Sequence, residues 1–197
     1  MSKSVDYYVS LRSPWVYLGS ARLEEMAARH GATIAVKPVD FGNIFPRTGG
    51  LPLPKRAPER QAYRLVELQR WRTHLDIPLN LHPAHFAVDE SLAARTVIAA
   101  EDGKRVALAH AILRAVWTEE RDISDPATLK AIAAGCGLEA EALLAKAQEA
   151  ELQAAYEAQT EEAVTRGVFG APTYVYRDEL FWGQDRLAFL DRALAAA

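Results

Sequence analysis

The stretch Val168-Phe169-Gly170-Ala171-Pro172-Thr173, followed at once by the β-prone run 173–176, decides the fold of this chain. Pro172 has no N–H to donate to a sheet, so we expect it to occupy the first residue of a strand. A cis Ala171-Pro172 bond is one interpretation, because it leaves the N–H and C=O of the preceding residue free to pair with the main chain of a ligand. An ordinary trans proline that opens a strand is the alternative.

The N-terminal segment predicts the other half of the same sheet. Residues 5–10 form a β-prone run, Arg12-Ser13 forms a short turn, and Pro14 fits the first position of a helix, where its missing N–H costs nothing. An apolar stripe and a cationic last turn lead this helix to a stop at Gly31, and a second strand follows over 32–39. Ser13 therefore lies at a helix N-terminus.

Helices fill the middle of the chain. Pro58 opens one helix, Asp89 caps another, Asp125-Pro126 starts a third, and residues 138–166 predict helix with one break. The order strand, helix, strand, helices, then proline, strand, turn, strand, helix predicts an α/β fold with a mixed four-stranded sheet. It is the order of a thioredoxin-like domain, residues 1–44 and 156–197, interrupted by a large all-helical insertion at 45–155.

Five fragments resemble one known family. The chain is similar to the bacterial 2-hydroxychromene-2-carboxylate isomerases, which are related to kappa-class glutathione transferases and to periplasmic disulfide oxidoreductases. The resemblance covers nearly the whole chain and rests on the fragments 11–18 (LRSPWVYL), 69–71 (QRW), 116–123 (VWTEERDI), 168–173 (VFGAPT) and 182–186 (WGQDR).

The resemblance implies glutathione as the cofactor and assigns residues to it. Ser13 would donate its hydroxyl hydrogen to the thiolate of glutathione. Such help is needed because a free thiol with a pKa of about 8.5 is only slightly ionised at neutral pH. Gln184 and Asp185 would hold the γ-glutamyl end, and Ala171, before Pro172, would give backbone contacts to the cysteinyl part. On the residues alone, Ser13 could be a plain helix cap and Asp185 could merely cap the helix that follows it.

For the reaction, the resemblance implies interconversion of 2-hydroxychromene-2-carboxylate and trans-o-hydroxybenzylidenepyruvate in aromatic degradation. The thiolate would add to the conjugated carbon, the bond made single would rotate, and the thiol would leave. The substrate is a small aromatic oxo-acid whose carboxylate needs a cation or backbone donors, and the candidates are Arg12, Lys37 and Arg56. Most such cations only keep a protein dissolved. An aromatic pocket could be lined by Trp15, Tyr17, Trp71 and Trp182, although aromatic residues are more often core.

One segment departs from the family. The isomerases usually show a Gly-Asn step before prolines in the loop after the second strand, whereas residues 48–56 here are TGGLPLPKR. Without that asparagine the pocket is less polar, so a different conjugated oxo-acid, or an electrophile that stays conjugated to glutathione, is an open alternative. A kappa-like transferase would consume glutathione and an isomerase would not. A third alternative is a thioredoxin-fold binding module without catalysis.

Composition narrows the remaining classes. The chain has 197 residues, half of them hydrophobic, which is enough to bury a full core. We expect a cytoplasmic protein, since no segment approaches the roughly 18 to 20 apolar residues of a membrane span and the N-terminus lacks the features of a signal peptide. A net charge of −3 with interspersed signs argues against nucleic acid as a partner. No membrane partner and no metal are expected, and the family implies a homodimer.

The single cysteine argues against disulfide exchange. Cys136 lies between Gly135 and Gly137, and the positions that a C-x-x-C pair would take are Ser13 and Val16. A small apolar residue near a helix boundary and a reactive thiol are the two interpretations of Cys136.

Overall fold

The computed structural model describes residues 3–196; residues 1, 2 and 197, at the outer ends of the predicted thioredoxin-like domain, lie outside the described residues. Four strands form one sheet in the order β2-β1-β3-β4. They are β1 (Lys3–Val9), β2 (Ala32–Pro38), β3 (Thr173–Tyr176) and β4 (Glu179–Trp182). β1 runs parallel to β2 and antiparallel to β3, so the sheet is mixed as the sequence predicts.

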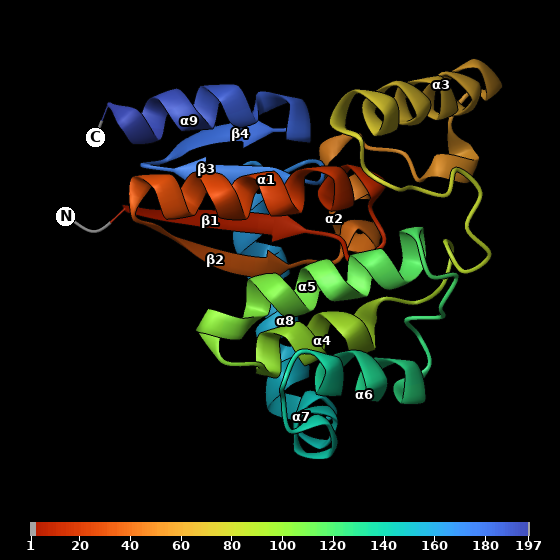
Figure 1. The fold of residues 1–197 in the computed structure, drawn as a ribbon, viewed down its shortest axis with the longest axis vertical. Coiled ribbons are helices and arrows are strands. Elements are labelled where there is room, and N and C mark those ends of the chain that lie inside the picture. The colour runs from red at the N-terminus through yellow and green to blue at the C-terminus, as the bar shows by residue number, and fades with distance from the viewer. Residues whose placement is uncertain (1–2, 197) are drawn as a thin grey trace.

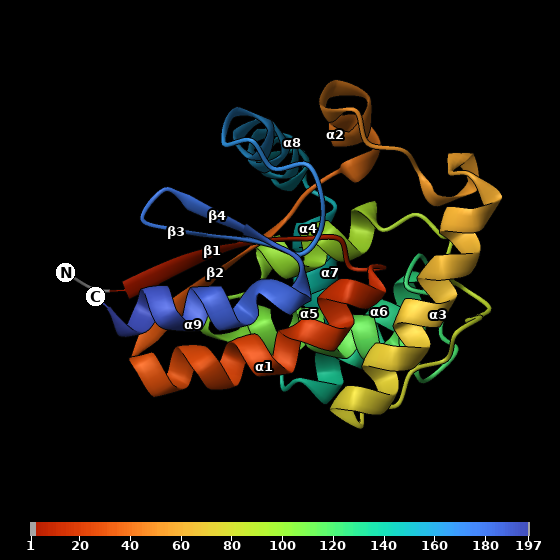
Figure 2. The ribbon, with the colours of Figure 1, turned by 90° about the horizontal axis from the view of Figure 1, so that it is seen from above.

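Helices cover both faces of this sheet, as Figure 2 shows. Helices α1 (Pro14–His30) and α9 (Leu187–Ala195) lie on one face, and α2 (Phe41–Thr48) and α8 (Ala150–Thr165) lie on the other. Successive side chains of β1 point to opposite faces of the sheet. Tyr7 belongs to the core on the side of α1, and its neighbour Tyr8 belongs to the cluster beneath α2 and α8. Side chains of successive residues therefore serve different faces.

The remaining helices fall into two groups. α4 (Ser91–Ala99), α5 (Asp102–Trp117), α6 (Pro126–Gly135) and α7 (Ala140–Ala147) gather beside the β2 edge, whereas η1 (Leu53–Lys55) and α3 (Pro58–Leu75) lie past the end of the sheet where α1 begins (Figure 1). The predicted division into a thioredoxin-like domain and a helical insertion, at 44/45 and 155/156, remains a prediction. Its two boundaries fall inside helices α2 and α8. No helix among residues 3–196 is long and apolar enough to cross a membrane.

Most of the predicted element boundaries are confirmed. α1 begins at Pro14 and ends at Gly31, which adopts φ 61° in the left-handed region. Asp125 caps α6 through the backbone N–H groups of Ala127 and Thr128. The predicted break in 138–166 falls between α7 and α8.

Several boundaries differ from the sequence expectation, and one helix is new. β1 covers residues 3–9 rather than 5–10, and β2 ends at Pro38 rather than at residue 39. β3 begins at Thr173, one residue after Pro172, and the N-cap position of α4 is Glu90 rather than Asp89, although an Asp89 carboxylate oxygen still accepts the N–H of Ser91. α2 was not predicted. It contains Pro46, yet Asp40 accepts the N–H of Gly42 at 2.7 Å and nucleates it.

Candidate functional site

Sheet register brings three segments together at one end of the sheet. Tyr8 of β1 pairs with Thr173 of β3, so the 170–172 loop lies beside the chain that leaves β1 toward Ser13. The N–H of Gly183 donates to the C=O of Pro172 at 2.9 Å, which brings the start of η2 (Gln184–Arg186) to the same place. The start of α1, the proline loop and η2 therefore lie at the same end of the sheet.

Ser13 is the N-cap of α1. Its oxygen accepts the N–H of Val16 at 3.4 Å, a long hydrogen bond, and the side chain is half-buried. Among residues 3–196 nothing accepts the hydroxyl hydrogen of Ser13. The first turn of α1 contains no acidic residue, so the positive end of this helix is not neutralised locally. Ser13 can thus cap the helix and still donate to an anion placed before it.

The proline loop presents unused backbone groups. The Ala171-Pro172 bond is cis, and the hydroxyl of Thr173 holds the turn by donating to the C=O of Gly170 at 2.7 Å. Among residues 3–196, neither the N–H nor the C=O of Ala171 has a hydrogen-bond partner. Gly170 is required here because a Cβ would collide with the indole ring of Trp182. The half-buried Ala171 can therefore pair with an extended main chain.

Gln184 and Asp185 differ in their availability. Gln184 is buried, and its side-chain oxygen accepts from Arg22 at 2.7 Å, so this oxygen serves the contact between η2 and α1. The Asp185 carboxylate is exposed and bonded by the adjacent Arg186 at 2.7 Å. Asp185 caps neither η2 nor α9, since neither helix has a side-chain cap bond. This exposed carboxylate near the proline loop has Arg186 as its one partner within residues 3–196, which leaves its other oxygen for an ammonium group.

A buried carboxylate lies behind the Ser13 turn. Glu90 accepts from the Ser10 hydroxyl at 2.8 Å, from the Leu11 N–H at 2.5 Å and from Arg12 Nε at 3.0 Å. Burial raises the pKa of the Glu90 carboxyl above its ordinary value, while Arg12 and the other donors act against that rise. Arg12, proposed from sequence as a substrate contact, also donates to the C=O of Val88 at 3.1 Å. Its guanidinium is thus engaged in holding the turn.

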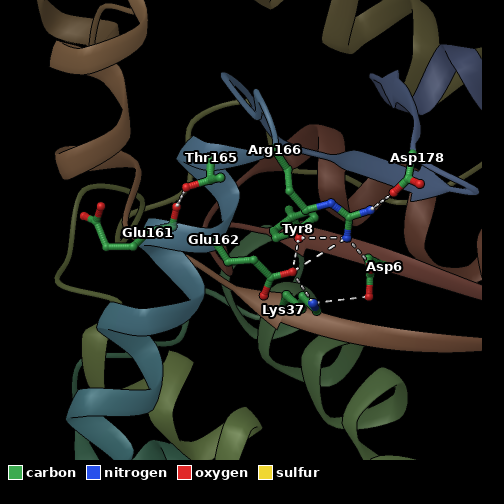
Figure 3. Close-up of polar contacts among 8 residues, drawn as sticks. All are labelled: Asp6, Tyr8, Lys37, Glu161, Glu162, Thr165, Arg166 and Asp178. Carbon is green, nitrogen blue, oxygen red and sulfur yellow. Dashed lines mark hydrogen bonds and ion pairs between the residues drawn. The ribbon is translucent and has the colours of Figure 1, made fainter.

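Lys37 lies on the opposite face of the sheet. Figure 3 shows its ammonium group between Asp6 and Glu162, at 3.3 and 2.6 Å, within a network that also includes Tyr8 and Arg166. Partial burial opposes ionisation of Glu162, but hydrogen bonds from Lys37 and Tyr8 outweigh it and lower the pKa of this carboxyl. The structure therefore does not bring Lys37 to the Ser13 segment.

The other candidate contacts are placed as follows. Arg56 precedes α3 and donates to the C=O of Leu51 at 2.8 Å. Trp15 is half-buried against the core, and Tyr17 is buried with its hydroxyl donating to the C=O of Pro78 at 3.0 Å. Trp71 also packs against the core. Trp182 is half exposed and lies 4.7 Å from the ring of Phe169, beside the proline loop.

Cys136 behaves as a packing residue. It is half-buried at the C-terminal end of α6, and burial raises the pKa of its thiol. A raised pKa reduces the thiolate fraction, which favours the structural interpretation over a reactive thiol.

Sequence reasoning did not single out two charged residues: Glu90, which is buried behind the Ser13 turn, and Arg64 of α3, whose Nη2 is buried without a hydrogen-bond partner among residues 3–196. Nothing in the local pattern singles out Glu90, because its partners lie about 80 positions away along the chain. Arg64 left a signal: it precedes Leu68 by four residues and Leu75 by eleven, and so interrupts the buried side of α3.

Comparison with known proteins now defines the class. The family model described as the DSBA-like thioredoxin domain matches residues 4–195. Together with the mixed sheet and the cis-proline loop, this match makes the chain a member of the DSBA-like thioredoxin domain family.

Individual relatives narrow the class further. A 2-hydroxychromene-2-carboxylate isomerase of Sphingobium xenophagum is 31% identical over 195 residues, which cover 98% of this chain and 99% of that protein. A solved 2-hydroxychromene-2-carboxylate isomerase aligns with a TM-score of 0.85 and 28% identity, over 98% of this chain and 95% of that one. Human glutathione S-transferase kappa 1 is 24% identical over 208 residues, covering 98% and 92% of the two chains. Within its family the chain groups with the 2-hydroxychromene-2-carboxylate isomerases, which supports an isomerase enzyme.

Proposed function

We propose that this protein is a glutathione-dependent isomerase of 2-hydroxychromene-2-carboxylate and trans-o-hydroxybenzylidenepyruvate, or of a close aromatic analogue. The proposal is supported chiefly by three groups at the same end of the sheet: the Ser13 hydroxyl hydrogen and the backbone of Ala171, neither with a partner among residues 3–196, and the exposed Asp185 carboxylate. A thiol tripeptide needs these three partners: a donor to sulfur, a main-chain pair and an anion for its ammonium group.

The residues fit glutathione in a defined orientation. Ala171 would hold the cysteinyl main chain, Asp185 would pair with the γ-glutamyl ammonium group, and the side-chain amide nitrogen of Gln184 would donate to the neighbouring carboxylate. Bound glutathione would supply a thiolate able to add reversibly to a conjugated carbon and so permit rotation about the adjacent bond. Ser13 and the N-terminus of α1 would favour the ionised sulfur, since one hydrogen bond to a charged group contributes about 1.5 to 3 kcal/mol.

A kappa-like glutathione transferase is the second candidate. Two observations favour it: the full-length match to the human kappa enzyme, and the segment 48–56, which lacks the Gly-Asn step usual in the isomerases. A Cβ at Gly50 would collide with the ring of Phe45, so this site does not admit a larger residue unless Phe45 moves. Stoichiometry separates the two functions, because only a transferase consumes glutathione.

Calorimetric titration with reduced glutathione tests the proposed cofactor site. Wild-type protein should bind one equivalent, and Asp185→Asn should weaken binding about tenfold or more by removing the charge that pairs with the ammonium group. Glu179→Gln is the matched control, since it removes an exposed carboxylate of β4 that makes no ion pair within the described residues.

Substrate assays complete the test. Isomerisation of 2-hydroxychromene-2-carboxylate that requires glutathione and leaves its concentration unchanged supports the isomerase, and loss of glutathione into a conjugate supports the transferase. If millimolar glutathione gives neither a heat of binding nor a rise in melting temperature, the protein is instead a binding module that does not use this cofactor.

Cellular context belongs to the same proposal. A glutathione-dependent enzyme of aromatic compound catabolism would act in the cytoplasm, where reduced glutathione is available. We also propose a homodimer, the commonest soluble assembly, which sedimentation equilibrium would measure directly.

A further inference from the structure

A cavity of about 370 Å³ lies between α3 and the segment 76–90 that follows it. A volume of this size suits a small organic molecule. Seven of its ten lining residues are apolar or aromatic, among them Leu81, Phe86 and Trp117, and the three polar ones are Gln61, Arg64 and His82.

Two hydrogen-bond donors in this wall are buried and unused. Within residues 3–196, Nη2 of Arg64 and Nε1 of Trp117 are both shielded from solvent, and neither has a hydrogen-bond partner. Trp117 is completely buried. Buried polar groups are almost always paired, so two unpaired donors on residues that line the same cavity indicate an acceptor that the described chain does not provide.

Arg64 also lacks a counter-ion. Among residues 3–196 no carboxylate forms an ion pair with it, and its guanidinium instead lies over the rings of Phe86 and Trp117, at 5.1 and 5.9 Å from their centroids. Burial, with a smaller contribution from the charge of Arg56, lowers the pKa of Arg64 to about 10. The side chain stays charged at neutral pH. A bound anion would offset the cost of burying this charge and its repulsion by Arg56.

The segment 76–90, part of which lines the cavity, also contacts the start of α1. The Tyr17 hydroxyl donates to the C=O of Pro78 at 3.0 Å, and the Arg12 guanidinium donates to the C=O of Val88 at 3.1 Å. Both carbonyls belong to the segment 76–90. Both donors belong to the first turn of α1 or the turn before it, and Figure 1 shows α3 beyond the end of the sheet where α1 begins. A ligand in the cavity would therefore lie next to the start of α1.

We propose that this cavity binds an aromatic or conjugated carboxylate, with Arg64 and the Trp117 indole N–H holding the carboxylate and Phe86 contacting the planar body. Guanidinium groups match carboxylate geometry, and the indole supplies a further donor. The proposal rests on the proposed function, because it names the group that recognises the carboxylate of the substrate. It favours Arg64 over Arg12 and Lys37, whose charged groups already have carboxylate partners.

Titration of wild-type protein with trans-cinnamate and with trans-cinnamamide tests the pocket without glutathione. Cinnamate should bind at least about tenfold more tightly than the neutral amide. Arg64→Met should remove this preference and leave the affinity for the amide unchanged. Arg60→Met is the control, since Arg60 is exposed on the same helix and should leave both affinities unchanged.

Three results would overturn the proposal: equal affinity of the wild type for acid and amide, no binding at millimolar cinnamate, or equal loss in the Arg64 and Arg60 variants. The wild-type comparison stands even where a variant fails to fold. An Arg64→Met protein that isomerises with unchanged KM would reject this pocket and leave the proposed function intact. Charge-dependent cinnamate binding without glutathione binding would reject the proposed function and leave the pocket.

Discussion

At the scale of single residues, the Ser13 hydroxyl caps α1 and, in the proposed function, also donates to the thiolate. Ser13 accepts the N–H of Val16 at 3.4 Å as the cap of α1 and retains a hydrogen to donate. Capping and thiolate stabilisation are therefore compatible in one side chain, and the two roles can be separated by choice of substitution.

Ser13→Ala and Ser13→Gly should both lose turnover, by about ten- to a hundredfold, because each removes the donor to sulfur. Stability should distinguish them, since alanine at an N-cap costs about 1 kcal/mol and glycine only a few tenths. Steady-state kinetics and urea unfolding measure the two effects. Equal turnover in wild type and Ser13→Gly would show that the hydroxyl plays no part in catalysis.

Glu90 gives a prediction about pH. Burial holds its pKa in the folded protein above the value of 4.5 for a free glutamate, so the folded state binds the proton more tightly than the unfolded chain. Its contribution to stability is therefore fully present below pH 4.5 and is lost as pH rises through the folded pKa.

Comparison with Glu90→Gln isolates this contribution. The stability of the wild type relative to the variant should fall as the pH rises from 4.5 through the folded pKa of Glu90, by about 1.4 kcal/mol for each unit of pKa difference. Urea unfolding at several pH values measures it, and Asp89→Asn, an exposed neighbour, is the control. If the wild type instead becomes more stable relative to Glu90→Gln as the pH rises, the assignment of a raised pKa to Glu90 is wrong.

At the scale of elements, the close approach of η2 to α1 depends on Gly19. A Cβ at Gly19 would lie 2.9 Å from both the hydroxyl oxygen of Tyr174 and Cβ of Gln184, and both residues are buried. A methyl group there would push η2, and Asp185 with it, away from the proline loop.

Gly19→Ala should thus destabilise the protein by about 1 to 3 kcal/mol and weaken glutathione binding. Gly103→Ala, in α5, has no atom within 4 Å of its added Cβ and should stabilise by about 0.5 to 1 kcal/mol. Thermal unfolding and the glutathione titration on both variants measure these effects. If Gly19→Ala matches Gly103→Ala, close packing at this position is not what holds η2.

Local signals account for what the sequence could predict at this scale. The helix starts at Pro14, Pro58 and Pro126, the cap at Asp125 and the stop at Gly31 are read from neighbouring residues, and those boundaries are confirmed. α2 escaped prediction because Gly42 and Pro46 disfavour a helix, which instead gains stability by burying Phe41 and Ile44 under α8. The partners of Glu90 and the pocket of Arg64 depend on contacts between distant segments, which one sequence does not reveal.

At the scale of the whole molecule, a polar network fastens α8 to the sheet. Figure 3 shows Glu162 of α8 contacting Lys37 of β2 and Tyr8 of β1, while Arg166 reaches Asp6 of β1. α8 leads the chain from the inserted helices back to β3, so these contacts hold together the two segments, 1–44 and 156–197, of the predicted thioredoxin-like domain.

This network should make the protein sensitive to acid. The pKa of Glu162 in the folded protein is lower than its ordinary value of 4.5, so its stabilising contribution is present above pH 4.5 and is lost as pH falls through the folded pKa. Glu162→Gln should lower the melting temperature at pH 7, and this deficit should shrink as the pH approaches 3. Glu157→Gln, exposed on the same helix, should show neither effect. Calorimetric melting at pH 3, 4, 5 and 7 measures the difference, and a deficit that stays constant over this range would mean that Glu162 acts by packing rather than by its charge.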